Sequence, residues 1–167
     1  MTRPIFEKSI TAAPEHIDEL GHVNNAVWVQ WIQDVALAHW YGVASPEHQD
    51  AYIWVVVRHE IDYLLPAFDG ETLTGRTWVG DAPKGARFDR HMEFVGEDGK
   101  VRVRAVTQWA IIDKAAGRPI RVPPEVVAPF MGAGLDCDHD AAPAPRLLPL
   151  LGGLSGPSRA QFERRGI

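Results

Sequence analysis

Residues 16–25 read HIDELGHVNN, and an apolar segment continues from them as far as Trp40. This segment contains neither glycine nor proline, and only two glutamines and Asp34 form a narrow polar stripe along it. A helix that is apolar almost all round is typical of the interior of a protein. The segment therefore predicts a long helix, over residues 25–41, that the rest of the chain wraps.

The polar residues before this helix form a loop that ends at the helix N-terminus. The side-chain oxygen of Asn24 or Asn25 can accept a hydrogen bond from a free N–H group of the first turn, so either residue can cap the helix. The first N–H groups of a buried helix also favour negative charge that develops near them. Because Asp18 and His22 lie in the same loop, this end of the helix is the candidate reactive site.

Composition and charge restrict the class of partner. The 167 residues are enough for one domain with a proper core. The net charge of −5 argues against nucleic acid, because proteins that bind nucleic acid usually carry a basic field. No apolar run approaches the length of a membrane span, and the N-terminus carries no apolar signal region. We therefore expect a partner that is neither nucleic acid nor membrane.

Cysteine and histidine usage bears on metals and on the cellular compartment. Cys137 is the only cysteine, which excludes an internal disulfide framework and a multi-cysteine zinc site and fits a reducing cytoplasm. The seven histidines include no pair at positions i and i+4. The sequence thus predicts a cytoplasmic protein without a metal site.

Outside the helix, the pattern changes to short segments rich in β-branched and aromatic residues, most of which alternate apolar and polar positions. This pattern predicts strands over residues 5–11, 53–64, 71–79, 87–95 and 101–112. Gly42 is predicted to end the helix as a left-handed cap, and residues 45–50 to form a loop. Pro123-Pro124 is predicted to begin a short helix that extends to Phe130.

The order of these segments indicates the fold class. One strand, one buried helix and four antiparallel strands follow one another, and a single sheet can cover a single helix. We therefore expect an α+β domain over residues 1–131. Residues 132–167 are rich in glycine, alanine, aspartate and proline, and are predicted to be an appended tail that a partner subunit partly orders.

The motif D-x-x-G-H-V-N-N-A at residues 18–26, followed by tryptophans at 28 and 31, resembles the hotdog-fold acyl thioesterases. It is similar to the 4-hydroxybenzoyl-CoA thioesterase type and to the acyl-ACP thioesterases. Residues 58–70 and 109–119 resemble later strands of the same family, so the likeness covers about residues 4–130. It departs from the plant acyl-ACP enzymes at Leu20, where they carry asparagine, and at Asp34, where they carry glutamate.

The resemblance implies a hotdog fold, in which a five-stranded antiparallel sheet wraps one central helix, and it implies hydrolysis of an acyl thioester. Asp18 would act as a general base for water or as a nucleophile, and the N–H groups of Asn24 and Asn25 would stabilise the oxyanion. His22 would polarise the carbonyl or orient the water, or it would only hold the loop. No metal or redox cofactor is implied, and CoA enters as part of the substrate.

Three further residues are assigned to substrate binding, namely Gly21, Trp28 and His59. Trp28 and His59 each have a simpler alternative, because tryptophans are mostly core residues and a strand histidine often faces solvent. The arginines of the last two strands can bind the CoA phosphates or form a solvated strand face, and the second interpretation is preferred for Arg87, Arg90, Arg102 and Arg104.

The expected function is therefore that of an acyl-CoA thioesterase. The alternatives are an acyl-ACP thioesterase, an enoyl-thioester hydratase that uses Asp18 and His22 as a proton-transfer pair, and a non-catalytic protein that binds acyl thioesters. A single sheet of this kind leaves one edge exposed and the helix half covered. We therefore expect a homodimer or homotetramer with the active site at the subunit interface.

Overall fold

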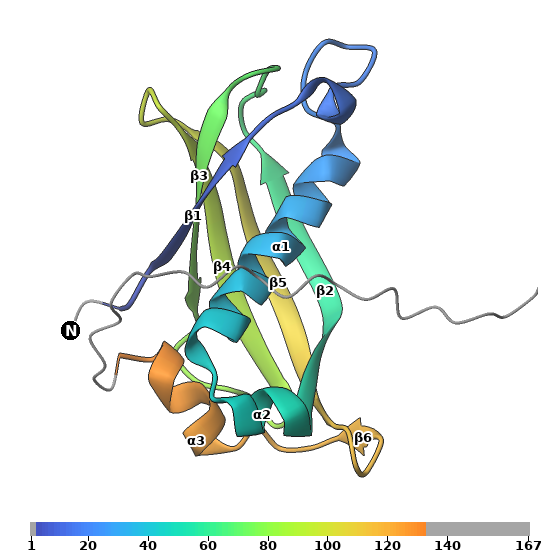
Figure 1. Cartoon of the computed structure of the whole chain (residues 1–167), viewed down its shortest axis with the longest axis vertical. Coiled ribbons are helices and arrows are strands. Elements are labelled where there is room, and N and C mark those ends of the chain that lie inside the picture. The colour runs from blue at the N-terminus through green and yellow to red at the C-terminus, as the bar shows by residue number, and fades with distance from the viewer. Residues whose placement is uncertain (1–2, 133–167) are drawn as a thin grey trace, which may run out of the picture.

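A curled antiparallel sheet covers one side of a long helix, as Figure 1 shows. The computed structural model describes residues 3–132. The sheet has the strand order β1-β3-β4-β5-β2, and a two-residue strand pairs with β5 beyond this path. The strands are β1 (Phe6–Thr11), β2 (Tyr52–Tyr63), β3 (Thr72–Val79), β4 (Arg87–Gly96), β5 (Val101–Asp113) and β6 (Arg118–Pro119). The predicted α+β hotdog fold is confirmed.

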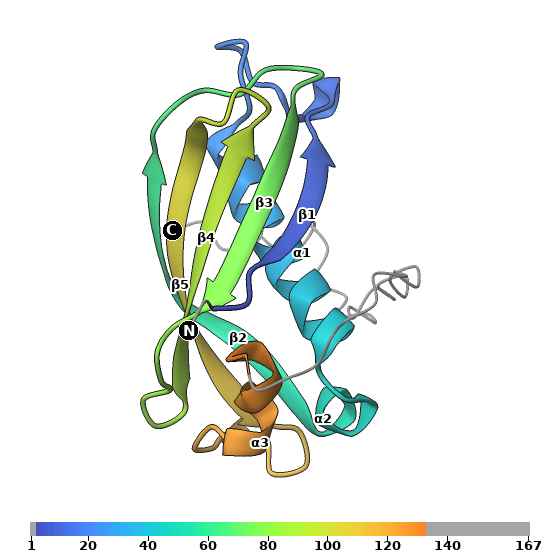
Figure 2. The same cartoon turned by 90° about the vertical axis from the view of Figure 1, so that its left-hand side faces the viewer.

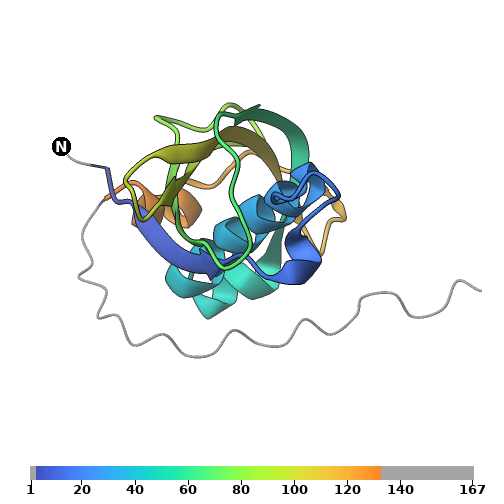
Figure 3. The ribbon, with the colours of Figure 1, turned by 90° about the horizontal axis from the view of Figure 1, so that it is seen from above.

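The central helix α1 (Asn25–Val43) lies across the concave face of the sheet. Seen from above, the strands curl around it (Figure 3), and from the outer side of the sheet it lies behind β3 and β4 (Figure 2). Its buried face consists of Trp28, Trp31, Ile32, Val35, Ala36, His39 and Trp40. On the opposite face Gln30, Gln33 and Tyr41 are exposed, so the prediction of a helix enclosed on all sides is correct for one face only.

The segment after α1 differs from its prediction. Gly42 lies inside the helix and is not among the glycines with positive φ, so it is not a left-handed cap. Residues 45–50, predicted as a loop, belong largely to helix α2 (Pro46–Ala51). The Ser45 hydroxyl accepts a hydrogen bond from the N–H of His48, and proline occupies the first turn. Serine at the cap and proline at the first helical position are strong signals for the start of a helix, and they outweigh the loop-like composition.

The strands present alternate residues to the helix, as predicted. In β3 every second residue from Leu73 to Val79 is buried, and in β5 the same holds from Val103 to Trp109. Gly75 marks a close approach of the helix to the sheet. A Cβ atom there would lie 2.9 Å from Cγ2 of Val35 and 3.1 Å from Cε1 of Phe94, so the lack of a side chain lets α1 approach β3.

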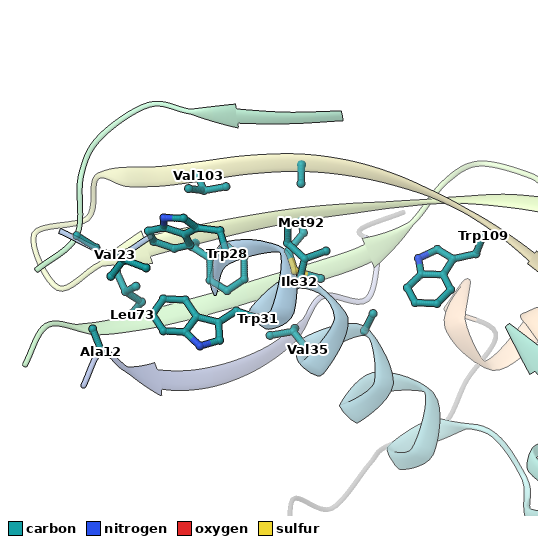
Figure 4. Close-up of a cluster of buried hydrophobic side chains, with 14 residues drawn as sticks. Ala12, Val23, Trp28, Trp31, Ile32, Val35, Leu73, Met92, Val103 and Trp109 are labelled. Atoms are coloured by element: carbon teal, nitrogen blue, oxygen red, sulfur yellow. The ribbon is translucent and has the colours of Figure 1, made fainter. Parts of the chain in front are cut away.

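The core has two parts along α1. In the part near the helix start, Trp28 lies beside Trp31 (Figure 4). Trp28 packs edge-on against Trp31 and against Phe94, with ring centroids 5.1 and 5.4 Å apart. In the other part, Trp40 stacks on Phe130 at 5.8 Å, beside the short elements α3 (Pro124–Val127) and η2 (Ala128–Phe130). This end of the chain confirms the predicted short helix. The predicted tail over residues 132–167 lies, apart from its first residue, outside the described residues.

Candidate active site

A short loop before α1 carries the predicted reactive residues. The loop follows η1 (Pro14–His16) and is closed by an isolated bridge between Ile17 and Val23. Within it the N–H of Asp18 donates to the carbonyl of His22 at 3.1 Å, and the N–H of Gly21 donates to the carbonyl of Asp18 at 3.0 Å. Gly21 has φ of 83°, a conformation that glycine adopts without strain. The reversal therefore fixes Asp18 beside the start of the helix.

Of the two asparagines predicted as possible caps of α1, Asn24 takes this position, and its Oδ1 accepts from the N–H of Ala26 at 2.8 Å. The N–H of Asn24 itself donates to the carbonyl of His16 at 2.9 Å, so it is already engaged. The N–H of Asn25 takes part in none of the hydrogen bonds found within residues 3–132. Of the two backbone donors predicted for an oxyanion, Asn25 is thus the one that has its hydrogen free.

Only one oxygen of the Asp18 carboxylate accepts a hydrogen bond within residues 3–132. Its Oδ1 accepts from the N–H of Leu20 at 2.9 Å, an Asx-turn that orients the side chain. Oδ2 has no hydrogen-bond partner in the described part of the chain, and the residue is half-buried. The His22 side chain is also half-buried and makes no hydrogen bond to any described residue. Both groups therefore keep polar atoms available to a ligand.

The three predicted substrate-binding residues do not gather at this loop. Gly21 is in the loop and exposed. Trp28 is buried among core residues, with 2% of its surface exposed. His59 lies on β2, where its Nδ1 is 2.9 Å from the hydroxyl of Thr107, and burial lowers its pKa from the usual value. Trp28 and His59 thus have internal packing partners, whereas Gly21 shapes the loop.

Sequence reasoning gave no role to Tyr63, which joins the end of β2 to the start of α1. Its hydroxyl donates to the carbonyl of Asn25 at 3.3 Å. No local pattern marks this contact, because the two residues are 38 positions apart in the chain. Because Asn25 is the first residue of α1, this contact places Tyr63, which is 45% exposed, at the helix end that follows the Asp18 loop.

A cavity of about 350 Å³ lies at the other half of α1. It opens between the helix, α2, η2 and the starts of β2 and β4, and three tryptophans contribute to its wall: Trp40, Trp54 and Trp109. Asp18 and Asn25 do not line it. The molecule therefore has a polar loop at the start of α1 and an apolar cavity beside its C-terminal half.

Arg90 lines this cavity, which corrects the prediction that it belongs to a solvated strand face. Its Nη1 donates to Nδ1 of His39 at 2.8 Å and to the hydroxyl of Thr77 at 3.1 Å. Burial lowers the pKa of Arg90 to about 10. The signal was present in the sequence, because Arg90 continues the alternation of buried Phe88 and Met92 on the inner side of β4.

His39 should make the folded state sensitive to acid. Burial, together with the positive charge of Arg90, lowers the pKa of His39 to about 3, whereas the unfolded chain has the ordinary value of 6.5. Between these values the unfolded state binds more protons, so the free energy of unfolding should fall as the pH falls from about 6.5 toward 3. The slope from this group is about 1.4 kcal/mol per pH unit.

Urea unfolding at pH 7 and pH 5 would measure the effect. In His39→Gln, whose amide oxygen can still accept from Arg90, the loss of stability between these two pH values should be smaller by about 1–2 kcal/mol. An equal loss in wild type and variant would contradict the assignment.

Comparison with known proteins agrees with this architecture. Residues 12–130 match the model of the thioesterase-like superfamily, and the chain belongs to that family. A comparison with curated proteins found no match. Within residues 3–132, no three potential metal ligands among histidine, cysteine, aspartate and glutamate lie together, and no helix is long and apolar enough to cross a membrane.

Three solved structures illustrate the similarity in fold. SAV2348 from Staphylococcus aureus, solved in complex with CoA, is 19% identical with a TM-score of 0.68, over 77% of this chain and 82% of that one. Slr0204 from Synechocystis, a 1,4-dihydroxy-2-naphthoyl-CoA thioesterase, is 17% identical with a TM-score of 0.64, over 76% and 96%. An acyl-ACP thioesterase from Bacteroides thetaiotaomicron is 21% identical with a TM-score of 0.66, over 83% and 58%.

Proposed function

We propose that this protein hydrolyses an acyl-CoA to a free carboxylic acid and CoA. The observation that carries the proposal is the loop at the start of α1. In this short, hydrogen-bonded segment, the Asp18 carboxylate has only Oδ1 engaged in a hydrogen bond and the N–H of Asn25 is free. Membership of the thioesterase-like superfamily supports the reaction class. A structural neighbour solved with CoA supports CoA as the carrier.

In the proposed reaction, Asp18 removes a proton from a water molecule as that water attacks the thioester carbonyl carbon. The carbonyl oxygen becomes an oxyanion, which accepts a hydrogen bond from the N–H of Asn25. The positive end of the α1 dipole adds to this stabilisation. The tetrahedral intermediate then collapses, the C–S bond breaks, and CoA leaves as a thiolate that takes up a proton.

A second route uses the same residues. Asp18 attacks the carbonyl carbon directly, CoA leaves as the thiolate, and water then hydrolyses the mixed anhydride to regenerate the carboxylate. His22 orients the water or the carbonyl in either route. Neither route uses a metal or a redox cofactor. Intact-mass measurement after rapid acid quench separates them, because only the second adds the mass of the acyl group to the protein.

Thiol release from a panel of aliphatic and aromatic acyl-CoAs tests the proposal. Turnover of any member would support it and begin to define the acyl group. Release only from acyl-ACP would change the carrier, and loss of enoyl-CoA absorbance without thiol release would indicate a hydratase. Acyl-CoA binding without any of these reactions would contradict an enzymatic role.

We further propose that the protein is a homodimer, or a tetramer built from two such dimers, paired along β2. This strand is at one edge of the sheet, and its exposed apolar side chains include Ile53, Val55 and Val57, which are 45%, 40% and 45% exposed. An unpaired edge of this kind favours pairing with another strand. Two-fold pairing would bring the Tyr63 end of one β2, next to Asn25, toward the start of the partner's β2 and its cavity.

Val55→Lys should therefore give a monomer, because the lysine charge would be buried at the paired edge. Light scattering of the full chain gives the mass of the particle. Ser9→Lys, on the exposed edge strand β1 at the other side of the sheet, is the matched control and should leave the mass unchanged. A wild-type protein that is monomeric at micromolar concentration would rule out this interface.

A further inference from the structure

We propose that the cavity beside the C-terminal half of α1 binds an organic carboxylate with an apolar body, and that Arg90 holds the carboxylate group. The cavity volume of about 350 Å³ is near the lower end of the range of about 300–1,000 Å³ that is typical of small-molecule sites. The site lies away from Asp18, and the binding of a carboxylate does not rest on the proposed hydrolysis; only its source as an acyl thioester, tested last, rests on that function.

The wall of the cavity suits an apolar body. Aromatic side chains come from the helix, from several strands and from η2, and aliphatic ones fill the space between them. The apolar residues of the wall include Leu37, Trp40, Trp54, Phe88, Trp109 and Phe130. Such a surface gains free energy when a hydrocarbon or an aromatic ring displaces water from it. The lining alone would accept many apolar molecules, so the polar groups must provide the selectivity.

Among the charged residues that line the cavity, Arg90 is the one on the inner side of the sheet. Both hydrogen bonds that it makes within residues 3–132 use Nη1, and both acceptors, His39 and Thr77, are neutral. A guanidinium has five N–H donors, so the three on Nε and Nη2 remain for a ligand. A carboxylate can accept two of them in parallel.

The charge of Arg90 has no anionic partner among residues 3–132, where no ion pair includes it. Arg90 is only partly buried, but a charge in an apolar wall without a counter-ion is poorly compensated, so an anion that neutralises it should bind favourably. Asp89 also contributes to the wall, but its carboxylate accepts from Gln108 at 3.1 Å, which places it on the outer side of β4. Lys114 adds a second positive charge to the lining.

A second polar group in the same wall lacks a partner. Nε1 of Trp109 is buried and forms no hydrogen bond within the described structure. Buried donors in folded proteins nearly always have an acceptor, which can be supplied by a bound ligand or by water as well as by the protein itself. Because Nε1 of Trp109 has almost no accessible surface, Arg90 is the donor of these two that a ligand reaches in the described conformation.

Titration with decanoate and decanol tests the proposal, because the two ligands share a hydrocarbon body and differ in the charged group. Three tryptophans in the wall provide a fluorescence signal, and calorimetry gives the stoichiometry. We expect decanoate to bind roughly tenfold or more tightly than decanol, in keeping with the strength of charge-assisted hydrogen bonds. Equal affinity, or no binding of decanoate, would overturn the proposal.

Arg90→Gln should abolish this preference while leaving decanol binding within about twofold of wild type. Arg87→Gln is the matched control, because Arg87 is exposed on the same strand and pairs with Gln108 on the outer side. Circular dichroism and thermal unfolding establish that each variant is folded. Retention of the preference in Arg90→Gln would assign it to another group, and if that variant does not fold, the comparison of decanoate with decanol in wild type decides.

The carboxylate can belong to a free acid or to the far end of an acyl thioester. The second source is tested by comparing the CoA monothioester of a long dicarboxylic acid with its methyl ester. A higher kcat/KM for the acid form that Arg90→Gln removes would assign Arg90 to the acyl terminus. Equal rates, together with preferential binding of decanoate, would assign the cavity to free acids.

Discussion

Asp18→Asn is expected to lower kcat/KM for acyl-CoA hydrolysis by about 10²- to 10⁴-fold, the usual contribution of a general base. Asparagine has nearly the same shape, and its side-chain oxygen can still accept the hydrogen bond from Leu20 that shapes the loop. The substitution therefore removes the basic group and leaves the fold in place. Thiol release under saturating and limiting substrate would give kcat and KM separately, and the loss should be mainly in kcat.

Glu19→Gln is the matched control, since it removes a negative charge from the next residue, which is exposed. Its activity should remain within about twofold of wild type, because exposed charges have weak effects at a distance. Full activity in Asp18→Asn would exclude Asp18 as base and as nucleophile. Equal losses in both variants would assign the effect to the overall charge of the loop.

Phe94→Ala is expected to lower the free energy of unfolding by about 3–5 kcal/mol, the range for removal of a buried aromatic side chain. Phe94 is fully buried and contacts Trp28 and Trp31, which are the residues that hold the start of α1 against the sheet. The cavity left behind would loosen the support of the Asn25 end. Chemical denaturation measures the stability, and hydrolysis should also decline.

Phe68→Ala provides the comparison, because Phe68 is 53% exposed and the same atoms are removed. Its loss of stability should stay below about 1 kcal/mol, as for most surface substitutions. Similar losses in the two variants would mean that Phe94 is not part of a tightly packed core.

The strands and the central helix could be predicted because burial imposes its period on the sequence. Residues 71–79 alternate in the chain as they alternate in the sheet, and the predicted boundaries of this strand differ from the observed ones by a single residue. The cap at Asn24 was also predictable, because its hydrogen bond to Ala26 is local. The family motif directed attention to the loop at Asp18, which the structure places next to that cap.

The remaining features depend on contacts between distant segments. The donation from Tyr63 to Asn25, and the engagement of the Asn24 N–H by His16, follow from how the loop folds back rather than from any spacing. The cavity is assembled from helices and strands that are far apart in the chain, so no single stretch predicts it. Arg90 was assigned to solvent because arginine usually is exposed, although its position in the alternation of β4 indicated the opposite.

The position of the cavity along α1 sets a length scale. A helix rises about 1.5 Å per residue, so the stretch from Asn25 to Gln33, the first helical residue of the cavity wall, spans about 12 Å. A ligand bound at both places in one subunit would have to be at least that long. The length of α1 between the two places therefore sets the minimum length of a ligand that occupies both. Inserting one helical turn between these residues would increase that minimum length by about 5.4 Å.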